Sequence, residues 1–238
     1  MTPAEIFKKN IAEVDNLINF DRQLLDLVTL TVEGLHDQLK SKFGDERLNG
    51  ARALAVIRGI RSNETLRLKY QAIYNQAVVL LVSHFASALG DLFRQAVSDR
   101  LASAEGGKLL EEELKLTVAD LKDRNWDLTG AIPDLLIAKH DFTFQDMGAT
   151  VRAFSTYAGI TPERNVVMNN IIAAQACRHV IVHAGGRVGD KTTRQLSKVI
   201  PRTFRQELRG GEQIAFTLEE IHSIKTDMVK FIETLAES

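Results

Sequence analysis

Apolar residues recur along this chain at helical spacing, and little interrupts them. Only 4 prolines and 15 glycines break a sequence of 238 residues, and between them the apolar positions recur every three or four residues instead of alternating as in strands. The last segment shows this best, because a capping box at 217–220 precedes one apolar stripe. The stripe comprises Leu218, Ile221, Ile224, Met228, Phe231 and Leu235. We therefore predict an all-α protein, with 213–216 as the one candidate for extended structure.

The predicted helices cover most of the chain. They span about 3–40, 54–60, 64–97, 108–124, 134–138, 143–159, 162–183 and 217–235. The helix over 64–97, capped by residues 61–64, is apolar enough to be a central helix packed on two sides. The helix over 108–124 is dense in charge, which predicts a solvated surface without a functional role.

Composition narrows the class of protein. Apolar residues make up 45% of the chain, as in ordinary soluble domains. A single cysteine, Cys177, cannot form an internal disulfide, and the N-terminus lacks the apolar stretch of a secretory signal. The longest apolar window, 77–82, is far shorter than the roughly 18 to 20 residues that span a bilayer. We therefore expect a cytoplasmic protein without a membrane span.

The charge is close to balanced overall but segregated along the sequence. The net charge of −1 argues against binding nucleic acid through bulk positive charge. However, residues 178–209 hold 8 basic and 2 acidic side chains, and residues 52–69 hold 5 basic and 1 acidic. The basic side chains Arg187, Lys191, Arg194 and Lys198 would line one face of a helix. We expect these four to contact an RNA backbone, although a solvated surface helix shows the same pattern.

The helix predicted over 162–183 carries the residues best suited to chemistry. From Val166 to Val182 it is apolar nearly all round, except that Arg178, His179 and His183 appear near its end. A guanidinium among apolar neighbours requires either an acidic partner or a bound anion. His179 and His183 lie four residues apart and therefore share a helix face. An arginine for phosphate charge and an imidazole for proton transfer are the minimum requirement for cleaving a phosphodiester without a metal.

Two other interpretations of these residues remain open. Arg178 could pair with an acid of another helix, while either histidine could cap the helix C-terminus, where the helix dipole favours positive charge. The His-x-x-x-His spacing also occurs at zinc sites on helices, but the intervening Val-Ile-Val supplies no glutamate base. We therefore expect neither a metal nor another cofactor at this site.

The run Arg178-His179-Val-Ile-Val-His183, followed by Ala-Gly-Gly, resembles the signature of the HEPN superfamily. That signature places an arginine, a polar residue, three further residues and a histidine at the C-terminal part of a helix. A long apolar helix such as 74–93, a loop region and a motif helix near the C-terminus are similar to the RiboL-PSP type of prokaryotic HEPN protein. The resemblance implies one HEPN-like helical domain over 1–238, with an N-terminal segment at 1–45 and a core at 61–238. It also implies a bundle with a long central helix and a buried motif helix.

The resemblance also implies an enzymatic activity. HEPN proteins often dimerise with two motif helices facing each other, and active members cleave RNA without a metal. The substrate 2′-hydroxyl attacks the adjacent phosphate, leaving a 2′,3′-cyclic phosphate and a 5′-hydroxyl. In this chain, the resemblance implies that His183 is the general acid or base and that Arg178 binds the phosphate and stabilises charge in the transition state. His179 occupies the variable polar position, where it orients the site or contacts the phosphate.

The expected function is therefore that of a metal-independent endoribonuclease acting on RNA as a homodimer through its motif helices. The expected setting is phage defence, stress response or a toxin–antitoxin pair, with an antitoxin or defence-system protein as a further partner. A second hypothesis is an inactive HEPN-like module that binds RNA, a nucleotide or a protein, because a fold does not fix an activity. A third is a purely structural helical scaffold, in which Arg178 pairs with a buried acid.

Overall fold

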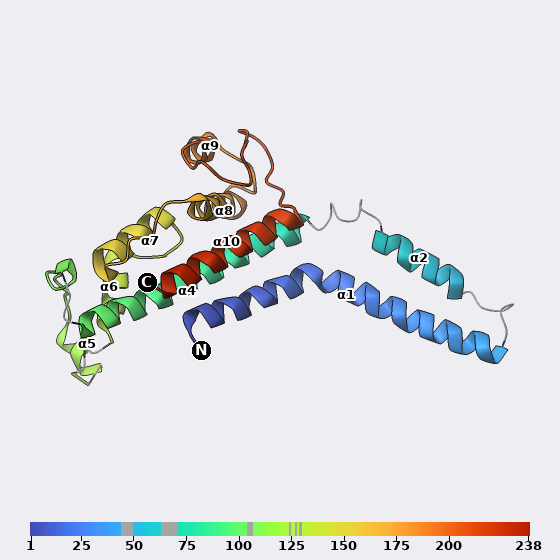
Figure 1. Ribbon diagram of the computed structural model, residues 1–238, viewed down its shortest axis with the longest axis horizontal. Helices are drawn as coiled ribbons and strands as arrows, with labels where there is room; N and C mark the ends of the chain where they lie inside the picture. The colour runs from blue at the N-terminus through green and yellow to red at the C-terminus, as the bar shows by residue number, and fades with distance from the viewer. Residues whose placement is uncertain (44–49, 63–70, 104–106, 124, 127, 129) are drawn as a thin grey trace.

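The computed structural model shows an elongated helical protein (Figure 1). The structure describes residues 1–43, 50–62, 71–103, 107–123, 125–126, 128 and 130–238. These residues form helices and no strand, which confirms the all-α prediction. The α-helices are α1 (Pro3–Phe43), α2 (Gly50–Ser62), α4 (Gln71–Ala102), α5 (Val118–Asp123), α6 (Ile132–His140), α7 (Met147–Ala153), α8 (Val166–His183), α9 (Asp190–Leu196) and α10 (Leu218–Ala236). A 3-10 turn, η3 (Gly107–Leu109), and a π-helical turn, η4 (Phe154–Ala158), complete the described helices.

Helix α4 lies at the centre of the protein. The first half of α1, α8 and α10 pack against it, and Figure 1 shows α10 running alongside it. The ring of Phe85 on α4 lies 5.9 Å from both Phe7 of α1 and Phe231 of α10, measured between centroids. Three helices that are far apart in the sequence therefore share one aromatic cluster, which contributes directional contacts beyond burial alone.

The length and composition of α4 would also allow it to cross a membrane. Residues 72–102 are long and apolar enough to span a bilayer, whereas the uninterrupted apolar window at 77–82 is too short. However, 61% of the apolar stretch is buried inside the protein. A core helix passes the same test as a membrane span, and packing against α1, α8 and α10 accounts for most of the apolar side chains of α4.

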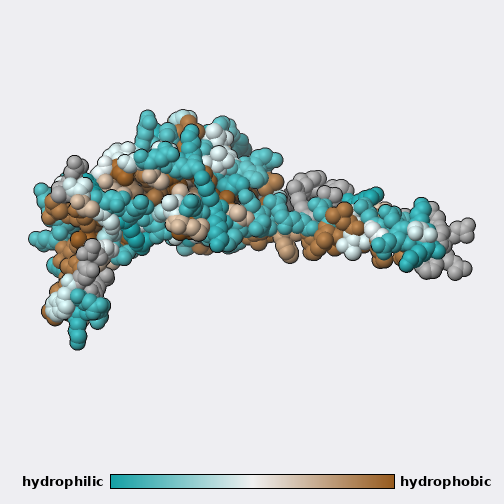
Figure 2. Space-filling model, turned by 60° about the horizontal axis from the view of Figure 1, so that its bottom comes forward, coloured by the Kyte–Doolittle hydropathy of each residue, from teal (hydrophilic) through white to brown (hydrophobic). Residues whose placement is uncertain are grey.

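The second half of α1 and helix α2 extend away from the core as an arm (Figure 1). Helix α2 packs on α1, where Thr29 and Leu54 are buried and Arg58 pairs with Glu33. Apolar side chains are nevertheless exposed along this part of the chain, and Figure 2 shows hydrophobic surface on the arm. The exposed side chains are Phe20, just before the arm, and Leu24, Leu27, Leu30, Leu35, Val56 and Ile60 on it. Among the described residues, the buried side chains by which α1 joins the core, such as Phe7, Ile11 and Val14, come from its first half.

The motif helix begins later than predicted. Helix α8 starts at Val166, and Pro162 lies outside it. The side chain of Asn165 accepts a hydrogen bond from the backbone N–H of Met168 at 3.0 Å and so caps the helix. The predicted stop after His183 and the capping box at Thr217 are both confirmed.

Other predicted boundaries differ in detail. The segment predicted as a helix over 143–159 forms α7, capped by Asp146, and continues as η4 to Ala158, with Gly159 as the C-cap. The extended candidate at 213–216 forms a single bridge between Gln213 and Arg187 instead of a strand. Part of the cap predicted at 61–64 lies outside the described residues, as does the predicted beginning of the central helix.

The prediction of a charge-dense helix over 108–124 is wrong. Among residues 108–123, which the structure describes, only η3 and α5 are helical, with an irregular segment between them. The carboxylate of Glu112 faces the protein, where Lys139 donates to it and His140 Nε2 lies 3.0 Å away. The hydroxyl of Tyr157 donates to the same carboxylate at 3.1 Å. The local pattern favours a helix here, but these tertiary contacts hold the chain in another conformation. Helix propensity is a weak preference that tertiary packing overrides.

The partners of Glu112 predict a pH-dependent contribution to stability. The hydrogen bond from Lys139 lowers the pKa of Glu112, assisted by hydrogen bonds with His140 and Tyr157 and opposed by burial. A carboxyl with a lowered folded-state pKa stabilises the protein above its unfolded pKa and loses that contribution as the pH falls through the folded value. We expect Glu112→Gln to lower the free energy of unfolding at pH 7. The difference in stability between this variant and the wild type should become smaller below about pH 4.

Urea unfolding at neutral and acidic pH measures this difference. The exposed neighbour Glu111 provides the matched control, and Glu111→Gln should leave stability unchanged at either pH. A loss for Glu112→Gln that is equal at both pH values would contradict the interpretation.

Candidate functional site

Helix α8 is buried over most of its length. It packs against both α4 and α10, and its side chains from Met168 to Cys177 are buried with the exception of Ile172. Burial raises the pKa of the Cys177 thiol to about 12, so this cysteine is neither ionised nor accessible as a nucleophile at neutral pH. Only the ends of α8 offer polar side chains to solvent, and the candidate site lies at its C-terminal end.

The structure brings the two predicted histidines together at this end. His179 and His183 are exposed, with ring centroids 4.7 Å apart and planes tilted by 47°. This places two imidazoles on one face of the helix, as their spacing predicts. They form a compact surface pair that can exchange protons with a bound substrate.

Arg178 lies beside the histidines and is half-buried. Its Nε atom is buried and has no hydrogen-bond partner among the described residues. No carboxylate in the described part of the chain forms an ion pair with Arg178. A buried N–H group without a partner costs free energy, and because Nε is closed to solvent, an anion would bind the terminal nitrogens of this guanidinium. The described residues therefore provide no support for the ion-pair interpretation of Arg178. They also contain no group of three or more His, Cys, Asp or Glu side chains arranged to hold a metal ion.

Two glycines turn the chain directly after the motif. Gly185 and Gly186 have φ angles of +57° and +80°, which residues with a Cβ rarely adopt. A Cβ on Gly186 would also lie 2.3 Å from Nε2 of Gln213. Hydrogen bonds from Val188 N to Glu212 O and from Ile214 N to Gly186 O then bind the two segments together. The turn reverses the chain, and the basic segment that follows runs back along α8 towards its N-terminal end, where Arg164 donates to the carbonyl oxygen of Lys198 and Asn169 to that of Pro201.

The four predicted RNA-contact residues are all exposed, but they do not share one helix. Helix α9 contains Lys191 and Arg194, whereas Arg187 precedes it and Lys198 follows it. The predicted single helical face is therefore only partly formed. Their exposure leaves the four charges available to a polyanion.

Arg202 has a structural role that its sequence context did not reveal. It is only 7% exposed. Its guanidinium donates to the carbonyl oxygens of Leu196, Val199, Arg205 and Gln206 at distances of 2.6 to 3.0 Å. The loop after α9 thus wraps around the Arg202 guanidinium, which is not available to a ligand.

Arg205 is also part of the folded loop. It forms an ion pair with Glu220 at 3.0 Å, and its guanidinium lies 5.1 Å from the ring centroid of Phe216. Two of the basic residues in the segment 178–209 therefore hold the loop in place instead of contributing freely to a binding surface.

The second predicted basic segment, 52–69, is described only in part. Arg52 is exposed on α2, and Arg58 forms the ion pair with Glu33 on the arm. Arg67 and Lys69 lie outside the described residues. The structure thus places the described part of this segment on the arm.

Two asparagines on α8 anchor the basic loop, and the sequence analysis missed both. Asn169 donates to the carbonyl oxygen of Pro201 at 3.0 Å. Asn170 donates to Asp227 at 2.6 Å and exchanges hydrogen bonds with Thr203. Two adjacent amides within an otherwise apolar, buried helix were the signal for this anchor, because buried polar groups require partners.

Comparisons with protein-family models, curated proteins and solved structures find no match to this chain. A guanidinium with an unpartnered N–H can bind an anion, and two adjacent imidazoles can transfer protons. These groups lie at a solvent-exposed helix end that is held on a buried scaffold.

The buried environment of Arg202 predicts a large effect on stability. Replacing Arg202 with Gln leaves several buried carbonyl oxygens without a donor, so we expect a loss of about 2 kcal/mol or more. The matched change Arg194→Gln affects an exposed side chain and should alter stability by less than about 0.5 kcal/mol. Urea unfolding of both variants measures the difference, and similar small losses would show that the Arg202 contacts do not stabilise the loop.

Proposed function

We propose that this chain is a metal-independent endoribonuclease of the HEPN type that acts in the cytoplasm as a homodimer. The observation that carries the proposal is the exposed His179–His183 pair beside Arg178, whose buried Nε has no partner among the described residues. The proposed reaction is attack of an RNA 2′-hydroxyl on the adjacent phosphate. It yields a 2′,3′-cyclic phosphate and a 5′-hydroxyl.

Each side chain has a specific role in this proposal. Arg178 binds the scissile phosphate and stabilises the negative charge that grows on it in the transition state. His183 acts as the general acid or base, and His179 orients the site or contacts the phosphate. Because the reaction uses the substrate's own hydroxyl as nucleophile, it requires neither a metal nor an enzyme nucleophile.

A second copy of the chain completes the proposed site. Val182 lies on the same helix face as His179 and His183 and is 46% exposed. An exposed apolar side chain beside two imidazoles suits a surface that another motif helix covers, and pairing two motif helices supplies catalytic groups to both sides of an RNA strand. The dimer is therefore proposed to form through the C-terminal ends of the two α8 helices.

The exposed basic residues provide the proposed path for the RNA. Arg187, Lys191, Arg194 and Lys198 follow the motif directly in sequence, and their segment leads from the motif end of α8 back towards its beginning, where Arg164 donates to the carbonyl oxygen of Lys198. We further propose a role in phage defence, stress response or a toxin–antitoxin pair. An antitoxin or defence-system protein would restrain the activity, because a nuclease that requires no metal has no cofactor through which it could be controlled.

The catalytic proposal predicts a strong dependence on the motif. We expect the protein to cleave synthetic single-stranded and hairpin RNAs in EDTA, and Arg178→Ala or His183→Ala to slow cleavage at least about 100-fold. The variant His222→Ala removes an exposed histidine from α10 and should retain full activity. Mass spectrometry of the products identifies the 2′,3′-cyclic phosphate ends.

Two results separate the competing functions. Uncut RNA in EDTA, or wild-type rates in both motif variants, would disprove the catalytic assignment. RNA binding that depends on Arg178 without any cyclic-phosphate product would instead support the inactive binding module.

The proposed RNA path predicts a salt-dependent effect. Replacing Lys191 and Arg194 together with Gln should weaken RNA binding and reduce the slope of log affinity against log salt by about 1.4, since each phosphate contact contributes about 0.7 for a single strand. The double variant Lys9→Gln with Lys122→Gln removes the same charge from exposed positions elsewhere. Fluorescence anisotropy across a salt series compares the two, and equal slopes would exclude this surface as the RNA path.

A further inference from the structure

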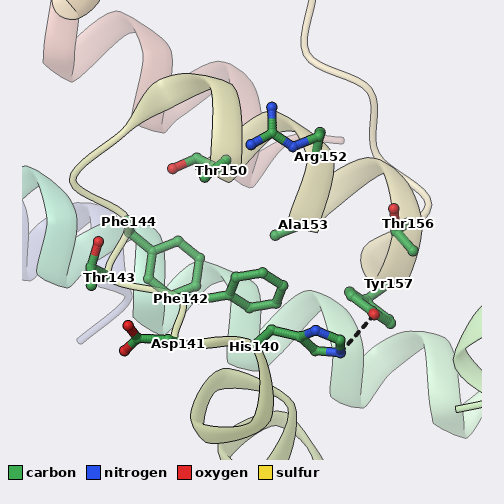
Figure 3. Close-up of a pocket in the computed structure, with 11 residues that line it drawn as sticks. His140, Asp141, Phe142, Thr143, Phe144, Thr150, Arg152, Ala153, Thr156 and Tyr157 are labelled. Atoms are coloured by element: carbon green, nitrogen blue, oxygen red, sulfur yellow. Dashed lines mark hydrogen bonds between the residues drawn. The ribbon is translucent and has the colours of Figure 1, made fainter.

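A cavity of about 320 Å³ lies between the end of α6 and the helical segment formed by α7 and η4 (Figure 3). None of the residues lining it belongs to the Arg178 motif or to the basic segment. Its size lies within the range of small-molecule sites. The cavity therefore offers a binding site that the proposed nuclease does not use.

Aromatic rings form one wall of this cavity. The rings of His140 and Phe142 are stacked, with centroids 5.2 Å apart and planes 19° from parallel. Tyr157 lies 6.0 Å from Phe142, and Phe93 of α4 packs edge-on against Phe142 from the core side at 5.8 Å. A wall of this kind favours a flat aromatic ligand, which can stack on one ring and meet another at its edge.

Hydrogen bonds hold this wall in a fixed position. Nε2 of His140 lies 2.8 Å from the hydroxyl of Tyr157, and both side chains contact the carboxylate of Glu112. Burial, together with the hydrogen bond to Glu112, raises the pKa of Tyr157 to about 12, so the phenol keeps its proton. Because the rings are fixed before a ligand arrives, less conformational entropy is lost on binding.

The opposite wall carries a positive charge. Arg152 of α7 lines the cavity across from Phe142 and His140 (Figure 3). It is exposed and forms no hydrogen bond or ion pair with another described residue. An arginine without a carboxylate partner at the rim of an aromatic cavity favours a ligand that combines a ring with an anionic group.

The backbone around the cavity is unusual. Tyr157 and Thr156 lie on η4, a π-helical turn, and π-helical turns occur frequently at functional sites. Asp141 and Phe144 have φ angles of +50° and +55°, a conformation that is costly for residues other than glycine. Both residues line the cavity. Asp141 is the left-handed C-cap of α6, and its backbone N–H donates to the carbonyl oxygen of Ile137, whereas Phe144 is buried among the aromatic rings.

We propose that this cavity binds a nucleoside monophosphate. The base stacks against Phe142 and Tyr157, and the phosphate is bound by Arg152 at the opposite rim. This site is separate from the catalytic motif and does not depend on the proposed nuclease activity.

Calorimetric titration with AMP tests the proposal. We expect the full chain to bind AMP, and adenosine and ribose 5-phosphate to bind at least about tenfold more weakly, because each lacks one half of the recognised ligand. Arg152→Gln should weaken AMP binding to a similar extent. The matched change Arg209→Gln removes a highly exposed guanidinium that does not line the cavity and should leave binding unchanged.

The same titration identifies results that overturn the proposal. Failure to bind AMP at about 1 mM would exclude a nucleotide site, and undiminished binding by Arg152→Gln would place the ligand elsewhere. Equal affinity for ribose 5-phosphate and AMP would mean that the site recognises an anion alone. His183→Ala, which tests the nuclease, should bind AMP normally, so the two proposals succeed or fail independently.

Discussion

The packing of α8 between α4 and α10 determines where chemistry can occur at the motif. Side chains on every face of this helix are buried for several turns, so any polar group within it must find a partner inside the protein. Cys177 shows the consequence, because burial keeps its thiol protonated. The same burial holds the last turn of α8 on a rigid support, so that Arg178 and the two histidines are presented at a fixed position.

The few polar groups within this buried region organise the loop beyond the motif. Asn169 and Asn170 bind the backbone and side chains of the segment that follows α9. Arg202 provides a second centre, around which four carbonyl oxygens converge. Such groups are costly when unpaired, and their full satisfaction favours one loop conformation over the alternatives. The position of the basic segment thus depends on hydrogen bonds inside the protein.

Formal charge is a poor guide to the charge available for binding in this protein. The net charge is −1, yet exposed cations follow the motif, and two other cations of the same segment are used for folding. Acidic residues differ in the same way, since Glu111 is exposed whereas Glu112 lies among Lys139, His140 and Tyr157. What a polyanion or a small ligand encounters is the set of charges left after internal pairing, and only this set acts in recognition.

The sequence by itself determined the helical class, the capping box at Thr217, the end of α8 and the shared face of His179 and His183. These features depend on interactions between residues a few positions apart, which spacing reveals directly. Only the tertiary structure decided the partners of Arg202 and Glu112, the anchoring by Asn169 and Asn170, and the aromatic cavity. Each of these joins segments whose contact depends on how the helices pack, and no local pattern encodes which distant group a buried side chain will meet.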